Sequence, residues 1–416
     1  MPQKRHIFVV RDDYISKTAE RVLFLKKIFV FLLSVAMIFT SLSVFAFAEN
    51  DSMMPVDVKA KSAVLMDQTT GKVLMKMNEN QKLYPASVTK IMSMLLVAEA
   101  IDNNTIRLTD EVTASTEASK KGGSQIWLKE GETMTVEELL KATAVYSAND
   151  ACTALGEYIA GSDEGFVMMM NERAQELGMK NTHFDNCTGL DDTTQTHLTT
   201  AYDIALMSRE LMKHQFIMQY TKIWMDSLRD GKTELVNTNK LIRFYEGATG
   251  LKTGTTSKAG CCISATATRN GTSLIAVVMG ADNSKDRFEG AKAMLNWGFA
   301  NYETVTPKID KSLITDVNII MGEEKKITPQ ISGNSQFLIP KGKEKDLTQE
   351  INLAAAVEAP VESNQTLGTV TVKLDGTTLG EYRLTAPHYV ERLSFGTVFR
   401  RMICSVCKEK KPVTVD

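Results

Sequence analysis

Runs of apolar residues divide the first part of the chain into strand-like and helix-like segments. Residues 63–67 and 72–77 are apolar-rich and flank Gln68-Thr69-Thr70-Gly71, which predicts two strands joined by a turn. Residues 261–268 and 272–279 flank Arg269-Asn270-Gly271, and Asn-Gly between two such runs is a strong hairpin signal. Strands are therefore expected at both ends of this region.

Helical periodicity fills the stretch between these strands. It predicts helices over 87–101, 136–146, 166–177, 200–214 and 286–299. The helix 200–214 is expected to carry Asp203 and Glu210 on its polar side. The pattern predicts an α/β (α+β) domain over 49–305, with an antiparallel sheet flanked by helices.

The pattern changes after about residue 306. Short β-rich runs appear, and Asp375-Gly376 separates 369–374 from 379–384 as a hairpin turn would. We expect a small β domain over 306–385. It has no cluster of His, Cys or paired acids suited to chemistry, so a spacer or docking role is favoured.

The last segment, 386–416, contains a basic amphipathic helix. Apolar side chains recur at i, i+3, i+4, i+7, i+8 and i+11, with basic residues among or beside them (Phe395, Val398, Phe399, Met402, Ile403 and Val406; Arg392, Arg400, Arg401 and Lys408). Such a helix tends to lie in a membrane interface. The alternative is packing on the β domain or on a partner.

The N-terminus predicts export. Lys26 and Lys27 precede an apolar run over 28–48 that closes with Ala46-Phe47-Ala48. A basic flank, an apolar core and a small-x-small exit describe a secretory signal peptide over 1–48, with an unusually long n-region. An uncleaved anchor is the alternative, since the run is just long enough to span a bilayer.

Composition excludes several classes of protein. The 416 residues are 43% hydrophobic and 24% charged, with a formal net charge of −2, which is ordinary globular usage. Without a basic excess, no nucleic-acid partner is expected. Six cysteines are too few for a disulfide scaffold, and we expect most to be reduced packing residues. Adjacent Cys261 and Cys262 should point to opposite faces of a strand.

Candidate chemistry begins with Ser87-Val88-Thr89-Lys90. Residues i and i+3 share a helix face, so the Ser87 hydroxyl and the Lys90 amine can meet. A serine needs a base to become a nucleophile, and a lysine acts as one only when burial or a neighbouring cation lowers its pKa. The helix N-terminus also offers partial positive charge to an oxyanion.

Two further motifs follow in the same domain. Ser147-Ala148-Asn149 lies at a predicted turn before a helix, where Ser147 can relay a proton and Asn149 can hold a substrate amide; an N-cap cluster is the alternative. Lys252-Thr253-Gly254-Thr255 precedes the strand at Cys261. There Gly254 allows close packing, the threonine hydroxyls can bind a carboxylate, and Lys252 can act as the cation that lowers the pKa of Lys90.

Ser-x-x-Lys, Ser-x-Asn and Lys-Thr-Gly in this order resemble the motif set of penicillin-binding proteins and class A β-lactamases. The chain is most similar in layout to the low-molecular-mass penicillin-binding proteins, the serine-type D-Ala-D-Ala carboxypeptidases of peptidase family S11. Segments 83–92, 182–190, 197–203 and 287–291, the β domain and the tail all share in this resemblance. Cys187 stands where proline is common in the family, and Thr255 where some members have histidine.

The resemblance implies a role for each matching residue. Ser87 would be acylated by the penultimate D-Ala carbonyl of a peptidoglycan stem peptide, with Lys90 as base and Ser147 and Asn149 completing the proton network. Lys252, Thr253 and Thr255 would bind the terminal carboxylate, and Arg287 would assist. The backbone N–H groups of Ser87 and Thr255 would form the oxyanion hole. β-Lactams would acylate Ser87, no cofactor or metal is expected, and the enzyme would act at the outer face of the cytoplasmic membrane or in the cell wall.

The sequence bears on four alternative functions. A β-lactamase is disfavoured because no Glu-x-x-Leu-Asn segment lies between Ser147 and Lys252. An endopeptidase uses the same chemistry on cross-links. A non-catalytic penicillin-binding sensor would acylate without turnover. A metal hydrolase is disfavoured because His183, His197 and His214 lack ligand spacing.

Overall fold

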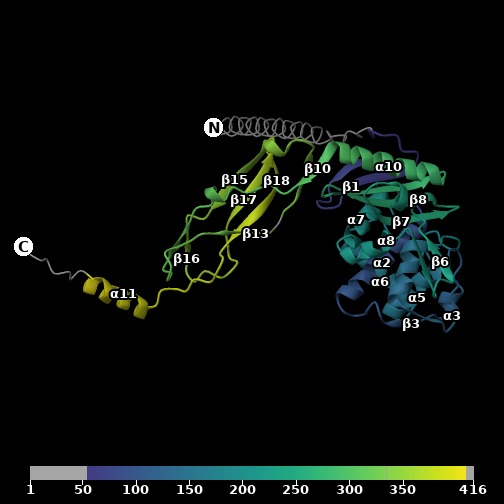
Figure 1. The fold of residues 1–416 in the computed structure, drawn as a ribbon, viewed down its shortest axis with the longest axis horizontal. Helices are drawn as coiled ribbons and strands as arrows, with labels where there is room; N and C mark the ends of the chain where they lie inside the picture. The colour runs from purple at the N-terminus through teal and green to yellow at the C-terminus, as the bar shows by residue number, and fades with distance from the viewer. Residues whose placement is uncertain (1–53, 334, 409–416) are drawn as a thin grey trace, which may run out of the picture. The chain divides into compact units, whose positions relative to one another are not determined.

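The computed structural model describes residues 54–333 and 335–408 (Figure 1). The segment 1–48 predicted as a signal peptide lies outside the described residues. The first domain is built on an antiparallel five-stranded sheet in the order β2-β1-β9-β8-β7. Its strands are β1 (Ser62–Asp67), β2 (Val73–Met77), β7 (Ala248–Thr256), β8 (Gly260–Arg269) and β9 (Thr272–Ala281). Both predicted strand pairs and the antiparallel sheet are confirmed.

Helices cover both faces of this sheet (Figure 1). Alternate residues of β1 point to opposite sides: Val64 and Met66 join the core beneath the helical region, whereas Ala63 and Leu65 join the core beneath α10. Cys262 and Cys261 divide in the same way, as predicted. The longer helices are α2 (Lys90–Asp102), α4 (Val136–Lys141), α5 (Asn149–Ala160), α6 (Asp163–Glu176), α7 (Ala201–Leu211) and α10 (Ser284–Asn301).

The first domain also contains short strand pairs and short helices. They are β3 (Glu111–Thr113) paired with β4 (Thr133–Thr135), β5 (Met225–Leu228) paired with β6 (Thr233–Val236), α3 (Thr116–Ser119), α8 (Met218–Thr221) and α9 (Leu241–Phe244). The predicted Asn-Gly turn joins β8 to β9 with Asn270 at φ 49° and Gly271 at φ 80°. Two left-handed residues are what a type I′ hairpin turn requires.

The structure corrects two local expectations. The helix expected over 136–146 is α-helical only to Lys141, and continues as a π-helix over Ala142–Tyr146. Asp203 is not on a polar face: it is buried in α7 and accepts hydrogen bonds from the Asn181 amide (3.1 Å) and the Thr182 hydroxyl (2.8 Å). These two donors, which come from outside the helix, stabilise the buried carboxyl and are invisible to helical periodicity.

Residues after α10 form small sheets with their own apolar clusters. The predicted hairpin at Asp375-Gly376 is confirmed as β17–β18. The strands are β10 (Tyr302–Val305), β11 (Val317–Ile320), β12 (Lys326–Ile327), β13 (Gln330–Ser332), β14 (Phe337–Pro340), β15 (Leu347–Leu353), β16 (Ala356–Glu358), β17 (Thr366–Leu374) and β18 (Thr377–Thr385). Helix α11 (Phe395–Lys408) follows, as the periodicity predicts.

Candidate active site

Ser87 lies in a tight turn that leads into a helix whose first nine residues are buried. The structure differs from the prediction of one α-helix, because Ala86–Thr89 is a 3₁₀ turn and α2 begins at Lys90. The i and i+3 side chains eclipse in a 3₁₀ turn, so the pair still meets. Ala86, just before the serine, has a left-handed backbone at φ 49°. Its side chain is fully buried, so packing holds this unfavourable conformation.

Lys90 makes three short contacts at its amine. Nζ lies 3.1 Å from Ser87 Oγ, 2.6 Å from Asn149 Oδ1 and 2.8 Å from the Thr188 carbonyl oxygen. The first nine residues of α2 are all buried, and Lys90 has no exposed surface. This burial lowers the pKa of Lys90 to about 8, because a charged amine loses its hydration there.

Ser147 and Asn149 are placed by a break between two helices. Ser147 ends the π-helix with a left-handed backbone (φ 67°), and Asn149 begins α5. The Asn149 amide group donates to the Gly122 carbonyl (2.6 Å) while its oxygen accepts from Lys90. Ser147 is buried but is not among the three partners of Lys90. The structure therefore joins Asn149 directly to the Ser87–Lys90 pair.

Strand β7 runs against the turn that carries Ser87. A Cβ built on Gly254 would lie 2.7 Å from the Ser87 amide nitrogen and 2.9 Å from the Pro85 carbonyl oxygen. Only glycine allows this approach, as the sequence predicts. Lys252, on the same strand, is buried and donates to the Thr253 carbonyl at 3.0 Å.

The electrostatic relationship between the two lysines differs from the expectation. Burial is what lowers the pKa of Lys90. The pKa of Lys252 is lowered by burial and then by the charges of Lys90 and Arg287. The neighbouring cation thus acts on Lys252, not on Lys90. Because Lys252 is buried near Lys90 and Arg287, its protonation is unfavourable while the site is empty. An incoming anion would offset this repulsion, so the arrangement suits a site that binds an anion.

The threonines after Lys252 are held in different ways. Thr253 donates to the Thr238 hydroxyl at 2.7 Å. The Thr255 hydroxyl lies 3.0 Å from Arg287 Nη1, which also donates to the carbonyl oxygens of Gly254 (3.1 Å) and Cys262 (3.2 Å). Arg287 is only 6% exposed. It therefore braces β7 and orients Thr255.

Comparison with known proteins shows the family of this chain. A model of D-alanyl-D-alanine carboxypeptidase (Peptidase S11) matches residues 48–283, and one of the C-terminal domain of penicillin-binding protein 5 matches 302–392. The chain belongs to the D-alanyl-D-alanine carboxypeptidase family. It is 42% identical over 362 residues to D-alanyl-D-alanine carboxypeptidase DacF of Bacillus subtilis, covering 86% of this chain and 92% of that protein. It is 35% identical to DacC of Escherichia coli, covering 84% of this chain and 89% of DacC.

Solved structures give the same result. Penicillin-binding protein 5 of Haemophilus influenzae is similar with a TM-score of 0.71 at 31% identity, covering 82% of this chain and all (100%) of that structure. Penicillin-binding protein D2 of Listeria monocytogenes in its cefotaxime-bound form is similar with a TM-score of 0.55 at 30% identity, covering 59% of this chain and 100% of that structure. A serine hydrolase of this family, with a mixed helix and antiparallel-sheet fold, is therefore confirmed.

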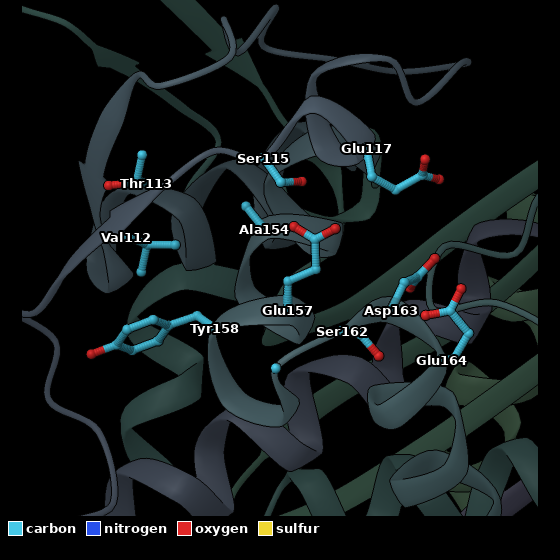
Figure 2. Close-up of a pocket in the computed structure, with 11 residues that line it drawn as sticks. Val112, Thr113, Ser115, Glu117, Ala154, Glu157, Tyr158, Ser162, Asp163 and Glu164 are labelled. Atoms are coloured by element: carbon cyan, nitrogen blue, oxygen red, sulfur yellow. The ribbon is translucent and has the colours of Figure 1, made fainter.

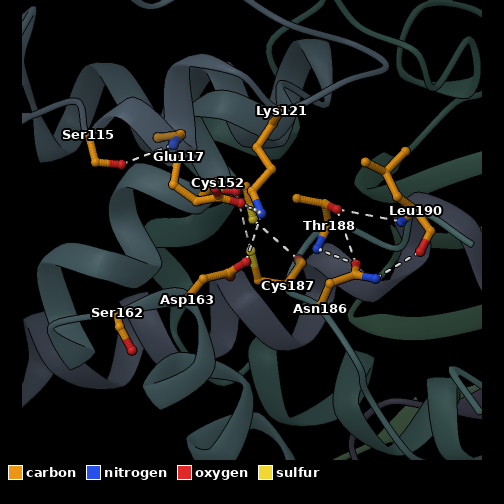
Figure 3. Close-up of polar contacts among 12 residues, drawn as sticks. Ser115, Glu117, Lys121, Cys152, Ser162, Asp163, Asn186, Cys187, Thr188 and Leu190 are labelled. Atoms are coloured by element: carbon orange, nitrogen blue, oxygen red, sulfur yellow. Dashed lines mark hydrogen bonds and ion pairs between the residues drawn. The ribbon is translucent and has the colours of Figure 1, made fainter. Parts of the chain in front are cut away.

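The turn that carries Thr188 supplies one of the contacts to Lys90. Figure 3 shows the contacts of Asn186 with Thr188 and Leu190 within this turn. The Asn186 side-chain oxygen accepts from the backbone amides of Thr188 (3.1 Å) and Gly189 (2.7 Å), and its amide group donates to the Leu190 carbonyl (2.8 Å). This arrangement directs the Thr188 carbonyl toward Lys90. Motif spacing alone did not identify Asn186 or Thr188, since backbone carbonyls carry no sequence signal.

The three motifs also did not identify His197, which contacts the turn that carries Ser87. It is fully buried, and its Nδ1 accepts from the Asp185 amide at 3.0 Å, so Nε2 carries the proton and donates to Thr89 Oγ1 at 2.8 Å. Thr89 in turn donates to the Ala86 carbonyl at 2.9 Å. Burial lowers the pKa of His197 to about 4, so the imidazole is neutral at pH 7. This chain of hydrogen bonds supports the strained residue next to Ser87.

An acid-lined cavity of about 470 Å³ lies elsewhere on the domain (Figure 2). Glu117, Glu157, Asp163 and Glu164 line it, and Lys121 pairs with Asp163 (2.8 Å) and Glu117 (2.9 Å). None of the three motifs contributes to its lining. Within 54–333 and 335–408, no group of three or more His, Cys, Asp or Glu side chains is placed to hold a metal ion.

Proposed function

We propose that Ser87 is the nucleophile of a D-Ala-D-Ala carboxypeptidase and that neutral Lys90 is its base. The contact of the fully buried Lys90 Nζ with Ser87 Oγ, at 3.1 Å, is the observation that carries this proposal. A neutral amine has two N–H donors and one lone pair. The oxygens of Asn149 and Thr188 can only accept, so they take both donors. The lone pair is then left for the Ser87 hydroxyl proton.

These positions support the following reaction. Lys90 takes the Ser87 proton as Oγ attacks the penultimate D-Ala carbonyl carbon of a peptidoglycan stem peptide. The resulting oxyanion is met by the backbone N–H groups of Ser87 and Thr255, and the close approach of Gly254 to the Ser87 amide supports this pairing. The terminal D-Ala amine leaves with the proton, which Ser147 relays. Water then hydrolyses the ester and restores the Ser87 hydroxyl. A β-lactam forms the same acyl-enzyme with Ser87.

Strand β7 supplies the anion-binding side of the proposed site. Lys252, Thr253 and Thr255 would receive the terminal D-Ala carboxylate, with Asn149 aligning the substrate amide. Because Arg287 already donates to Thr255 and to two carbonyls, we assign it a positioning role through Thr255. It need not touch the carboxylate itself.

We also propose that α11 holds the enzyme at the outer surface of the cytoplasmic membrane. Its apolar stripe is exposed, with Phe395 at 86%, Phe399 at 56% and Met402 at 62% exposure. Cationic Arg400 lies on the same helix and suits anionic lipid headgroups. No helix in the described part of the chain is both long and apolar enough to cross a bilayer.

Release of free D-alanine from a pentapeptide ending in Lys-D-Ala-D-Ala tests the catalytic proposal. The wild-type chain should release D-alanine and label with a fluorescent penicillin. Ser87→Ala should abolish both signals, and Lys90→Ala should slow acylation by several orders of magnitude, because the nucleophile loses its base. If the wild type labels at Ser87 but releases no D-alanine, the chain is a penicillin-binding sensor and the carboxypeptidase proposal fails.

A further inference from the structure

Trp127 is held in an unusual, outward-facing position. It is 74% exposed, while its neighbours Ile126 and Leu128 are 1% and 4% exposed. Its backbone has a left-handed φ of 60°, a conformation that a bulky side chain rarely adopts. Such a conformation persists only where the surroundings impose it, and it often marks a functional position.

The restraint comes from the helix that carries Asn149. Asp150 is fully buried, and its two carboxylate oxygens accept the amides of Ile126 (3.2 Å) and Leu128 (3.0 Å), on either side of Trp127. Its neighbour Asn149 accepts nothing from this loop but donates its own amides to the carbonyls of Gly122 (2.6 Å) and Ser124 (2.7 Å). The loop 122–128 is thus fastened at four points to residues 149 and 150.

An open cavity of about 620 Å³ lies beside Trp127. Besides Trp127 its walls carry the cationic side chains of Lys129, Arg229 and Lys232, with Glu132 as the single acid. Glu132 is already engaged by Arg229 Nε at 2.7 Å. Arg229 Nη2 is buried without a hydrogen-bond partner among the described residues. The cavity therefore combines one exposed aromatic face with several hydrogen-bond donors.

These features fit a sugar ring better than a peptide side chain. The C–H bonds of a sugar carry partial positive charge and stack on the electron-rich face of an indole, and its hydroxyl and acetamido oxygens accept hydrogen bonds from Lys and Arg. An aliphatic peptide side chain would need an enclosed apolar pocket, which this open, cation-rich cavity does not offer.

The distance of Trp127 from the proposed catalytic residues also suits binding of the glycan end of the substrate. The Gly122 carbonyl contacts Asn149. Trp127 lies five residues after Gly122, so the Cα atoms of Gly122 and Trp127 are within about 18 Å of each other. An extended stem pentapeptide covers a similar length. We propose that Trp127, Lys129, Arg229 and Lys232 form a subsite for an N-acetylated amino sugar of the glycan to which the stem peptide is attached. This inference rests on the proposed function.

Two substrates test the subsite: a free pentapeptide, and the same pentapeptide on a disaccharide of N-acetylated amino sugars. In the full chain, Trp127→Ala should lower kcat/KM for the disaccharide-linked substrate about tenfold through KM, with kcat unchanged. For the free pentapeptide the change should be less than about twofold. Trp127→Phe should restore most of the loss because it keeps an aromatic face. Phe244→Ala, which removes another exposed aromatic (70%), is the matched control and should change neither substrate.

Other outcomes overturn the inference in recognisable ways. Equal losses on both substrates would mean that Trp127 contacts the peptide or supports the loop. No loss on either would mean that the cavity binds no sugar. If the wild type releases D-alanine from neither, the proposed function fails, and titration of the peptide-free disaccharide against tryptophan fluorescence still decides the subsite. Saturable quenching of tryptophan fluorescence in the wild type that is lost in Trp127→Phe and in Lys232→Ala supports the subsite. Absence of quenching in the wild type refutes the subsite.

Discussion

Gly254 and Ser87 approach each other so closely that a Cβ on Gly254 would lie 2.7 Å from the Ser87 amide nitrogen. This contact joins a strand at the sheet edge to the turn before α2. It brings β7, the proposed anion-binding strand, next to Ser87, the proposed nucleophile, although 167 positions separate the two residues (254 − 87) in the sequence.

Gly254→Ala should push β7 away from Ser87 and disrupt the proposed oxyanion hole. Loss of one oxyanion donor typically costs a factor of about 100 in rate, and we expect a similar fall in the rate of penicillin acylation. Gly122→Ala is the matched control, because a Cβ there meets no atom within 4 Å. Equal acylation rates for the two variants would contradict the proposed contact.

The acylation rate should rise with pH up to the pKa of Lys90, about 8. Below this pH the amine is mostly protonated and cannot take the Ser87 proton, so the rate should rise about tenfold per pH unit and level off above it. Stopped-flow labelling with a fluorescent penicillin between pH 6 and 10 measures this. An inflection near the ordinary lysine value would show that Lys90 is solvated. Lys120→Gln, on an exposed lysine distant in sequence, should leave the profile unchanged.

The free energy of unfolding should fall between about pH 6.5 and pH 4 because of His197. Its folded-state pKa is about 4 against an ordinary 6.5, so in this range the unfolded state binds the extra proton. The stabilisation is complete above pH 6.5 and is lost by pH 4, a change of about 3 kcal/mol. Urea unfolding across this range should show a shallower acid dependence in His197→Asn. His388→Asn, at an exposed site after β18, should keep the wild-type slope, and identical slopes for all three proteins would refute the burial argument.

Thr89→Val tests whether the His197 hydrogen bonds position the nucleophile. The substitution keeps the shape but leaves His197 Nε2–H and the Ala86 carbonyl without their partner, which should cost about 1–3 kcal/mol in unfolding free energy. If Ala86 sets the geometry of Ser87, acylation should also slow in protein that is fully folded. Thr89→Ser, which restores the hydroxyl, should recover the rate. A destabilised variant with normal acylation would limit His197 to a structural role.

Removing residues 388–416 should release the enzyme from anionic lipid vesicles without loss of D-alanine release. Phe399→Asp in the full chain should weaken vesicle binding for the same reason, since it places a charge in the apolar stripe. Co-sedimentation measures both, with Glu391→Gln, outside α11, as the control. Unchanged vesicle binding after deletion would assign membrane attachment to another segment.

Local sequence was sufficient for the elements that depend on neighbours in the chain. The hairpin at Asn270-Gly271 follows from the left-handed backbone that its turn needs, and Ser87 and Lys90 meet because three residues return the chain to one side of a helical turn. The motif order was sufficient to suggest the family, and the helical spacing after Phe395 was sufficient for α11.

Tertiary structure decided what depends on burial and on distant partners. Whether Lys90 is an ordinary cation or a base near pH 8 depends on how completely α2 is enclosed, and periodicity does not report that. Helical periodicity placed Asp203 on a polar face, because it carries no information about the donors Asn181 and Thr182 in another segment. The His197–Thr89–Ala86 hydrogen bonds and the clamp of Asp150 around Trp127 join residues that no local pattern connects. Desolvation and long-range hydrogen bonding are properties of the packed chain, and they turn the motifs into a reactive site.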